Sequence, residues 1–212
     1  MLKQLATALL FAFGLAACST DDEIAAPALR YELGELRTDS QGKPLIVKLD
    51  NSLFIETKDY PLTLHPSSLY RVLVAYDHEH QSGLSTKVYH IVTVPAPPPS
   101  ASLEAQTTAP VRLLSLWRTE RYINLRLGIG RSYKGEHRAG FADKGIIEHP
   151  DGRRTQVLQL FHNDGGDRSD YTQEIYLSCP THQLRSTLRS DIDSLRFLVL
   201  TDKGLYQYNF LY

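Results

Sequence analysis

The chain has 212 residues, with 23 Lys and Arg against 24 Asp and Glu and a formal net charge of −1. Its length allows one large or two small domains, and its charge gives no basic field that would attract nucleic acid. Eleven prolines, 13 glycines and 12 tyrosines beside a single methionine indicate an all-β chain with many turns.

Residues 1–17 have the order of a secretory signal. Lys3 gives a short positive start, an uncharged apolar run follows, and Ala16 and Ala17 end it. The run is shorter than the about 20 apolar residues that a membrane-spanning helix needs. We therefore expect residues 1–17 to be removed from the mature protein.

The cysteine that follows this run indicates a lipid anchor. Residues 15–18, Leu-Ala-Ala-Cys, resemble the bacterial lipobox, which implies cleavage before Cys18 and acylation of its sulfur and new amino group. Several acyl chains on one residue are enough for stable membrane attachment. The alternative is an ordinary signal peptide that happens to contain a cysteine.

An acidic stretch follows Cys18 and consists of Ser19, Thr20, Asp21, Asp22 and Glu23. It resembles the signal that sends lipoproteins of Bacteroides-type bacteria to the outer face of the outer membrane. The alternative is a solvated tether over residues 18–27, since terminal segments of this composition are usually mobile. Either way we expect an outer-membrane lipoprotein, on the cell surface or on the periplasmic face.

Residues 28–94 predict a small β domain without a helix. Alternating or continuous apolar runs mark five strands, at 30–36, 45–50, 52–56, 70–76 and 86–94. Five short strands in this length are typical of a small closed barrel of the OB type.

Residues 95–110 are rich in proline and have no periodicity, which is typical of an extended interdomain linker or a long exposed crossover. Residues 111–212 then predict a β-sandwich, because seven short strands alternate with turn signals. The predicted strands are 111–117, 122–128, 139–148, 155–161, 172–178, 194–201 and 205–211, and residues 182–191 fit a short helix or a loop.

Three features of the sandwich segment have two readings each. Cys179 ends an alternating run, so we expect a buried thiol rather than a nucleophile, and no disulfide if Cys18 is acylated. Trp117 is expected in the core, with a sugar-stacking platform as the alternative. The alternating Tyr206, Tyr208, Phe210 and Tyr212 are expected to pack against the facing sheet rather than form a binding patch.

The sequence contains two candidate metal-binding sites. His78 and His80 lie on one side of an extended segment and could share Zn²⁺ with a third ligand, although the surrounding residues read as a solvated loop. Asp164 and Asp167 lie in an Asn- and Gly-rich loop that fits a calcium site less well than an ordinary turn, because the EF-hand spacing is absent. Neither a Walker loop nor a dinucleotide fingerprint occurs, so no cofactor is expected.

The ordered set of motifs resembles the NigD-like lipoproteins of Bacteroides-type bacteria. Besides the lipobox and its acidic stretch, the set comprises residues 70–76, 116–117, 122–125 and 160–167. The resemblance implies an OB-like N-terminal domain and an immunoglobulin-like C-terminal sandwich, with no catalytic residues to assign. The family name comes from a bacteriocin gene cluster, where an immunity or export role is supposed. The proline-rich segment departs from the family pattern.

Two functions from different classes follow. The first is a non-enzymatic, lipid-anchored envelope protein that binds a protein, peptide or glycan on the barrel face or between the domains, with an accessory or immunity role near bacteriocin systems. The second is a metal-assisted hydrolase that uses His78, His80 and the loop carboxylates. Nucleic acid is not an expected partner, because the chain is extracytoplasmic and nearly uncharged.

Overall fold

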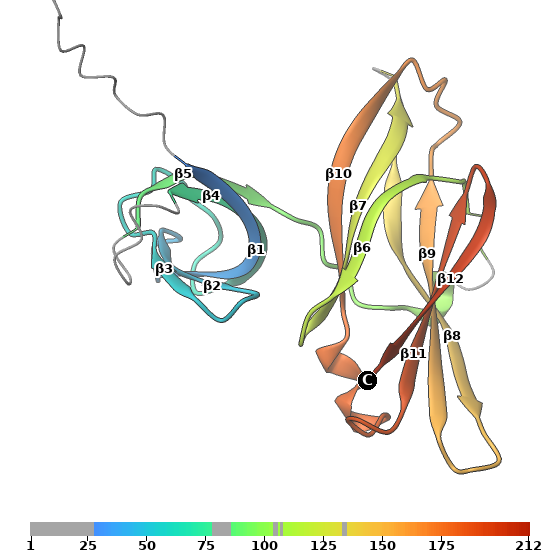
Figure 1. Ribbon diagram of the computed structural model, residues 1–212. Coiled ribbons are helices and arrows are strands. Elements are labelled where there is room, and N and C mark those ends of the chain that lie inside the picture. Colours follow the sequence, from blue (N-terminus) through green and yellow to red (C-terminus); the bar gives the residue numbers. More distant parts are fainter. Residues whose placement is uncertain (1–27, 78–85, 104–105, 107, 133–134) are drawn as a thin grey trace, which may run out of the picture.

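The computed structural model describes residues 28–77, 86–103, 106, 108–132 and 135–212 (Figure 1). It is nearly all β, with 59% of the chain in strands and 4% in helices. Two separate apolar clusters form, one in each half of the chain. Residues 1–27, including Cys18 and the acidic stretch, and the loop with His78 and His80 lie outside the described ranges, so their assignments stay predictions.

The N-terminal domain is one curled antiparallel sheet. Its strands are β1 (Leu29–Thr38), β2 (Pro44–Leu49), β3 (Phe54–Glu56), β4 (Leu69–Asp77) and β5 (Val88–Thr93), in the order β3-β2-β1-β4-β5. The expected five strands are confirmed. Within the described ranges β3 and β5 form no ladder with each other, so the sheet curls around its core without the closure that the sequence had led us to expect.

The C-terminal domain is a sandwich of two sheets. Its strands are β6 (Arg112–Arg118), β7 (Tyr122–Arg131), β8 (Arg138–Glu148), β9 (Arg154–Asn163), β10 (Tyr171–Pro180), β11 (Ser194–Thr201) and β12 (Gly204–Leu211). One sheet has the order β10-β7-β6 and the other β12-β11-β9-β8. The predicted seven-stranded sandwich is confirmed. Strands β9 and β11 pair in parallel, a departure from the antiparallel sheets of immunoglobulin domains.

The sandwich core follows from strand alternation. Ile123, Leu125 and Leu127 on β7 point between the sheets and are at most 1% exposed. They meet Phe141 and Phe197 of the other sheet, whose ring centroids are 5.9 Å apart. Burial of each such side chain contributes about 1.5–3 kcal/mol. The other face of β7 is therefore free to meet the N-terminal domain.

Two expectations on buried side chains have different outcomes. Cys179 is fully buried, as predicted. On β12, Tyr208, Phe210 and Tyr212 pack on the core, but Tyr206 is 43% exposed, so the expectation that all four aromatic residues pack against the facing sheet is wrong. Tyr206 lies close to the turn at Asp202–Lys203, on the edge strand of its sheet.

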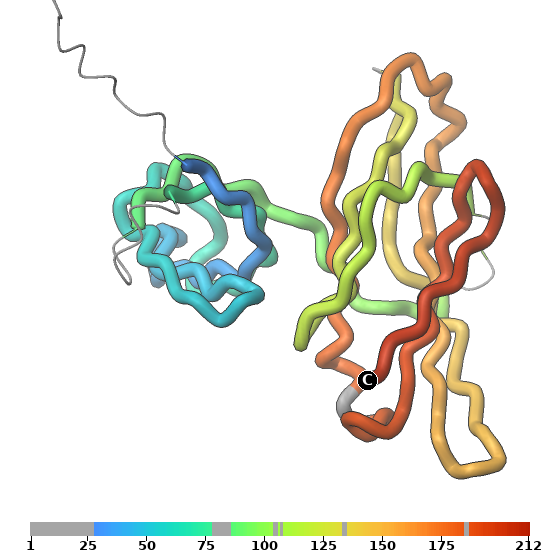
Figure 2. The backbone as a smooth tube through the Cα atoms, in the orientation of Figure 1, coloured from blue at the N-terminus to red at the C-terminus, as the bar shows by residue number. Residues whose placement is uncertain are grey.

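The proline-rich segment joins the domains and then follows the sandwich (Figure 2). Ser100 donates its N–H to Phe141 O at 2.8 Å and accepts from Asp143 N at 3.1 Å, and a short 3-10 turn, η1 (Ala101–Leu103), follows. Ala109 N then donates to His162 O at 2.7 Å. The described part of the segment is thus attached to the C-terminal domain by backbone hydrogen bonds. A second 3-10 turn, η2 (His182–Ser186), follows β10.

Within the described ranges, neither of these short helices has the length or apolar character to cross a bilayer.

Candidate functional site

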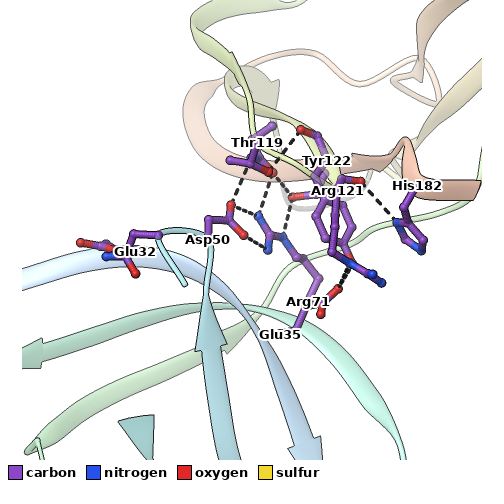
Figure 3. Close-up of polar contacts among 11 residues, drawn as sticks. Glu32, Glu35, Asp50, Arg71, Thr119, Arg121, Tyr122 and His182 are labelled. Atoms are coloured by element: carbon purple, nitrogen blue, oxygen red, sulfur yellow. Dashed lines mark hydrogen bonds and ion pairs between the residues drawn. The ribbon is translucent and has the colours of Figure 1, made fainter. Parts of the chain in front are cut away.

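The two domains are joined through a buried arginine (Figure 3). Arg71 of β4 has 1% of its side chain exposed and donates from both terminal nitrogens to the carboxylate of Asp50, at 2.6 and 2.5 Å. The same guanidinium donates to Asn124 Oδ1 at 3.0 Å and to Ser178 Oγ at 3.1 Å, both in the sandwich. Tyr122 places its ring 4.1 Å below the guanidinium carbon.

The side chains of this network have hydrogen-bond partners for the polar groups that they bury. Asn124 and Ser178 are fully buried and face each other across the β7–β10 ladder. Ser178 Oγ donates to Asn124 Oδ1 at 2.7 Å. A buried charge is tolerated only when it is paired and fully hydrogen-bonded. The network therefore fixes the position of one domain on the other.

A second polar contact lies beside the first. Glu35 Oε1 accepts hydrogen bonds from Tyr122 Oη at 2.7 Å and from Arg121 Nε at 2.9 Å. Burial alone raises the pKa of Glu35, but the hydrogen bond from Tyr122 and the charge of Arg121 outweigh it and lower the pKa below its usual value. Burial and the carboxylate of Glu35 raise the pKa of Tyr122 to about 12.

A groove of about 410 Å³ opens next to these contacts, between the outer face of the β10-β7-β6 sheet and the N-terminal sheet. Its lining consists of Tyr31, Glu32, Leu33, Asp50, Asn51, Leu73, Trp117, Thr119 and Tyr176. The volume lies in the range of small-ligand sites, and the mixture of aromatic walls with few polar groups is typical of them.

Strand registers explain how this lining forms. Leu33 of β1 pairs with Leu73 of β4, which gives one wall an apolar row next to the row of Glu35 and Arg71. On the sandwich side, Trp117 is in register with Asn124, and Tyr176 with Arg126. Both walls of the groove thus continue from the strands that carry the Arg71 contact.

Trp117 corrects an expectation from the sequence. It is half-buried, lies outside the apolar core cluster and lines the groove. The core assignment is wrong because alternation along a strand separates two faces but does not say which face is the core. Here the outer face of the sheet is partly covered by the other domain.

The carboxylates at the groove are compensated within the protein. Asp50 pairs with Arg71, as above. Glu32 Oε1 lies 3.5 Å from a terminal nitrogen of Arg30. The carboxylate of Glu32 also accepts hydrogen bonds from Asn51 Nδ2 at 2.7 Å and from Tyr76 Oη at 3.0 Å. Both carboxylates of the lining thus have an arginine as cationic partner.

A second cluster of titratable groups lies at the far end of the sandwich. Asp167 Oδ2 and His137 Nε2 are 2.9 Å apart, and His137 Nδ1 and His162 Nε2 are 3.0 Å apart. A carboxylate only accepts, so His137 Nε2 carries a proton; with both rings neutral, His162 Nε2 donates to His137. These two hydrogen bonds connect the loop before β8 with β9 and with the loop after it.

The pKa values of this cluster follow its surroundings. Hydrogen bonds from the side chain and backbone of Ser132 and from His137 hold the pKa of Asp167 well below its usual range. Burial and the nearby His137 lower the pKa of His162, which is 3% exposed. The cluster is thus an ionised Asp that orients two imidazoles, an arrangement that stabilises the loops.

The Asn- and Gly-rich loop after β9 forms the ordinary turn that the sequence favours over a calcium site. Asn163 Oδ1 and Asp164 Oδ1 accept from the backbone of Gly165 and Gly166, at 2.8 and 3.0 Å. Asp167 belongs to the histidine cluster, so Asp164 and Asp167 do not form one site. Among the described residues, no group of three or more His, Cys, Asp or Glu is placed to hold a metal.

Sequence reasoning missed most of the residues that join the domains. Arg71 and Asn124 each interrupt an apolar run, which is a signal of a buried polar partner. Glu35 and Ser178 carry no such signal. Their partners lie far away in sequence, and only the tertiary structure brings them together.

The fold and the groove define a two-domain all-β protein whose C-terminal sandwich is fixed against a curled sheet. The profile of the NigD-like C-terminal beta sandwich domain matches residues 95–212. The chain therefore belongs to the NigD-like family.

Solved structures share the fold over both domains. A NigD-like immunity protein from Bacteroides caccae superposes with a TM-score of 0.68 at 15% identity, over 86% of this chain and 97% of that one. A protein from Parabacteroides distasonis described as toxin-related gives 0.66 at 16% identity, over 87% and 93%. One from Bacteroides fragilis described as a lipoprotein gives 0.57 at 11% identity, over 85% and 96%. No match was found among curated proteins.

Proposed function

We propose that this chain is a non-enzymatic, lipid-anchored envelope protein that binds a partner in the groove between its two domains. The observation that carries the proposal is the groove itself. Its walls come from both domains, and the Arg71 network holds those walls in place. A preformed groove costs little ordering on binding.

The family supports an immunity-type role. One similar structure is described as an immunity protein and another as toxin-related. We propose that this chain has an accessory or immunity role near a bacteriocin system at the envelope of the producing cell. The anchor at Cys18 and export through residues 19–23 belong to the same proposal, and the similarity to a protein described as a lipoprotein supports them.

Two measurements test the anchor. The mass of the mature N-terminal peptide is expected to show acylated Cys18, and Cys18→Ser is expected to release the protein from membranes. An unacylated Cys18 in the mature protein contradicts the anchor.

A third measurement tests the export signal. Protease added to intact cells is expected to remove a surface-exposed protein and to spare a periplasmic one.

Photo-crosslinking tests the groove. A photoreactive amino acid replaces Tyr31, which lines the groove and is 60% exposed. The matched control replaces Tyr206, 43% exposed on β12, in the sheet away from the N-terminal domain (Figure 1). Irradiation of producing cells is expected to give an adduct from position 31 and none from position 206. Equal adducts from both positions, or none from either, contradict partner binding in the groove.

A further inference from the structure

Three aromatic side chains line the groove. Tyr31 on β1 is 60% exposed, and Trp117 and Tyr176 are half-buried on the facing sheet. Tyrosine and tryptophan supply large, rigid contact area that loses little conformational entropy on binding. The ring faces carry negative charge density and attract weakly positive C–H groups. A ligand with flat arrays of C–H bonds fits such walls.

The polar groups at the same groove favour an uncharged ligand. Asp50 is paired with Arg71 and Glu32 with Arg30, so no unpaired charge in the described lining calls for a counterion. Carboxylate oxygens keep spare acceptor positions beside these bonds, because each oxygen has two lone pairs. Thr119 and Asn51 add a hydroxyl and an amide. The polar groups of the lining can therefore accept hydrogen bonds from the hydroxyl groups of a ligand. Within the described lining they present no unpaired charge to it.

The shape of the groove does not favour a peptide strand. Strand addition needs an open strand edge that donates backbone hydrogen bonds. The central strands at the groove, β1, β4 and β7, are each paired on both sides. At Ser178, the edge strand β10 already donates its N–H to Pro95 O at 3.0 Å. Apart from the edge strand β6, which carries Trp117, the groove therefore offers side chains on sheet faces rather than backbone.

From these observations we infer that the groove binds a short neutral oligosaccharide, with sugar rings stacked on Tyr31, Trp117 and Tyr176 and hydroxyls bonded to Glu32, Asn51 and Thr119. A pyranose ring combines a C–H face with a rim of hydroxyl groups, which matches both parts of the lining. The inference rests on the proposed function, because it names the chemical class of the partner in the same groove.

The chain contains its own reporter for this test, since Trp117 is its single tryptophan. The full chain is kept in a detergent without a sugar headgroup. It is titrated with neutral linear oligosaccharides of glucose in α- and β-linkage, xylose, mannose, galactose and N-acetylglucosamine. At least one series is expected to shift Trp117 emission saturably, with the same affinity by calorimetry.

Variants then locate the binding. Tyr31→Ala and Tyr176→Ala are each expected to weaken binding by about tenfold or more, as for aromatic anchors at the centre of an interface. Tyr206→Ala is the matched control and is expected to bind as the natural chain does. Thermal unfolding of each variant separates lost binding from lost folding.

Two results overturn the inference: no oligosaccharide binds at millimolar concentration, or binding persists unchanged in Tyr31→Ala and Tyr176→Ala. The proposed function is tested separately, by the photo-crosslinking experiment at position 31, so neither of these results decides it. If the photoreactive group at position 31 forms a specific protein adduct while no sugar binds, the groove has a protein partner and only the oligosaccharide inference fails. If neither experiment gives binding, both fail.

Discussion

Arg71 and Ser178 are 107 residues apart in the sequence, yet Arg71 Nε donates to Ser178 Oγ at 3.1 Å in the buried contact between the two domains. The same guanidinium holds Asp50 and Asn124. One side chain of the N-terminal sheet thus bonds to two strands of the sandwich. The groove lies beside this contact, and Asp50 belongs to both.

Removal of the buried cation is expected to uncouple the domains. Arg71→Met leaves Asp50 without its cation and Asn124 and Ser178 without a donor. Breaking a buried pair from one side costs about 3–5 kcal/mol. We expect a lower Tm by differential scanning calorimetry and two separate transitions in place of one.

The control for Arg71→Met is Arg126→Met. Arg126 also pairs with a carboxylate, Glu174, but both side chains are about half exposed. Exposed pairs contribute little to stability, so this variant is expected to unfold as the natural chain does. An equal loss of Tm in both variants would show that burial of Arg71 is not what couples the domains.

Tyr122→Phe tests the second contact. The variant loses the hydrogen bond to Glu35, and bonds to charged groups contribute about 1.5–3 kcal/mol. The pKa of Glu35 is expected to rise, because burial still disfavours the carboxylate while one of the bonds that lower the pKa is gone. Carboxyl NMR titration of Glu35 measures this shift.

In the natural chain, absorbance titration is expected to include a tyrosine that ionises only near pH 12, and the amplitude of this step is expected to fall in Tyr122→Phe. Tyr206→Phe is the control and is expected to retain it. An unchanged Glu35 titration in Tyr122→Phe would mean that Arg121 alone sets the pKa of Glu35.

The histidine cluster predicts acid sensitivity. The pKa of His162 is lowered in the folded protein, so its contribution to stability is present above the unfolded value of about 6.5 and is lost as the pH falls through the folded value. The lowered pKa of Asp167 acts in the same direction at a more acidic pH, below about 3.9. Urea unfolding at pH 7, 6 and 5 is expected to show a loss of stability that is smaller in His162→Gln.

His65→Gln is the matched control for this series, because His65 is exposed on a loop. It is expected to retain the pH dependence of the natural chain. A pH dependence in His162→Gln as steep as in the natural chain would assign the acid sensitivity to other groups.

Cys179 is expected to be inert in the folded protein. Burial raises the pKa of its thiol, and none of the side chain is exposed. Because the thiolate is the reactive form, iodoacetamide at pH 8 is expected to label it only after denaturation. Rapid labelling of the native protein would contradict the burial of Cys179, and Cys179→Ser identifies the label.

Strand positions were largely predictable because they follow from local alternation. All twelve predicted strands are present. The two wrong side-chain assignments, Trp117 and Tyr206, concern which surface of a strand meets another element. Alternation gives two faces and does not say what covers each of them.

The sequence by itself determined the all-β class, the places of the strands, the burial of Cys179 and the family resemblance. These features depend on apolar periodicity and turn chemistry within a few residues of each other. Only the tertiary structure decided that Arg71 bonds across the domains, that His137 meets Asp167, and that Trp117 and Tyr31 face one groove. Those relationships join residues whose separation in the chain leaves no local pattern, and they exist only after the sheets have packed.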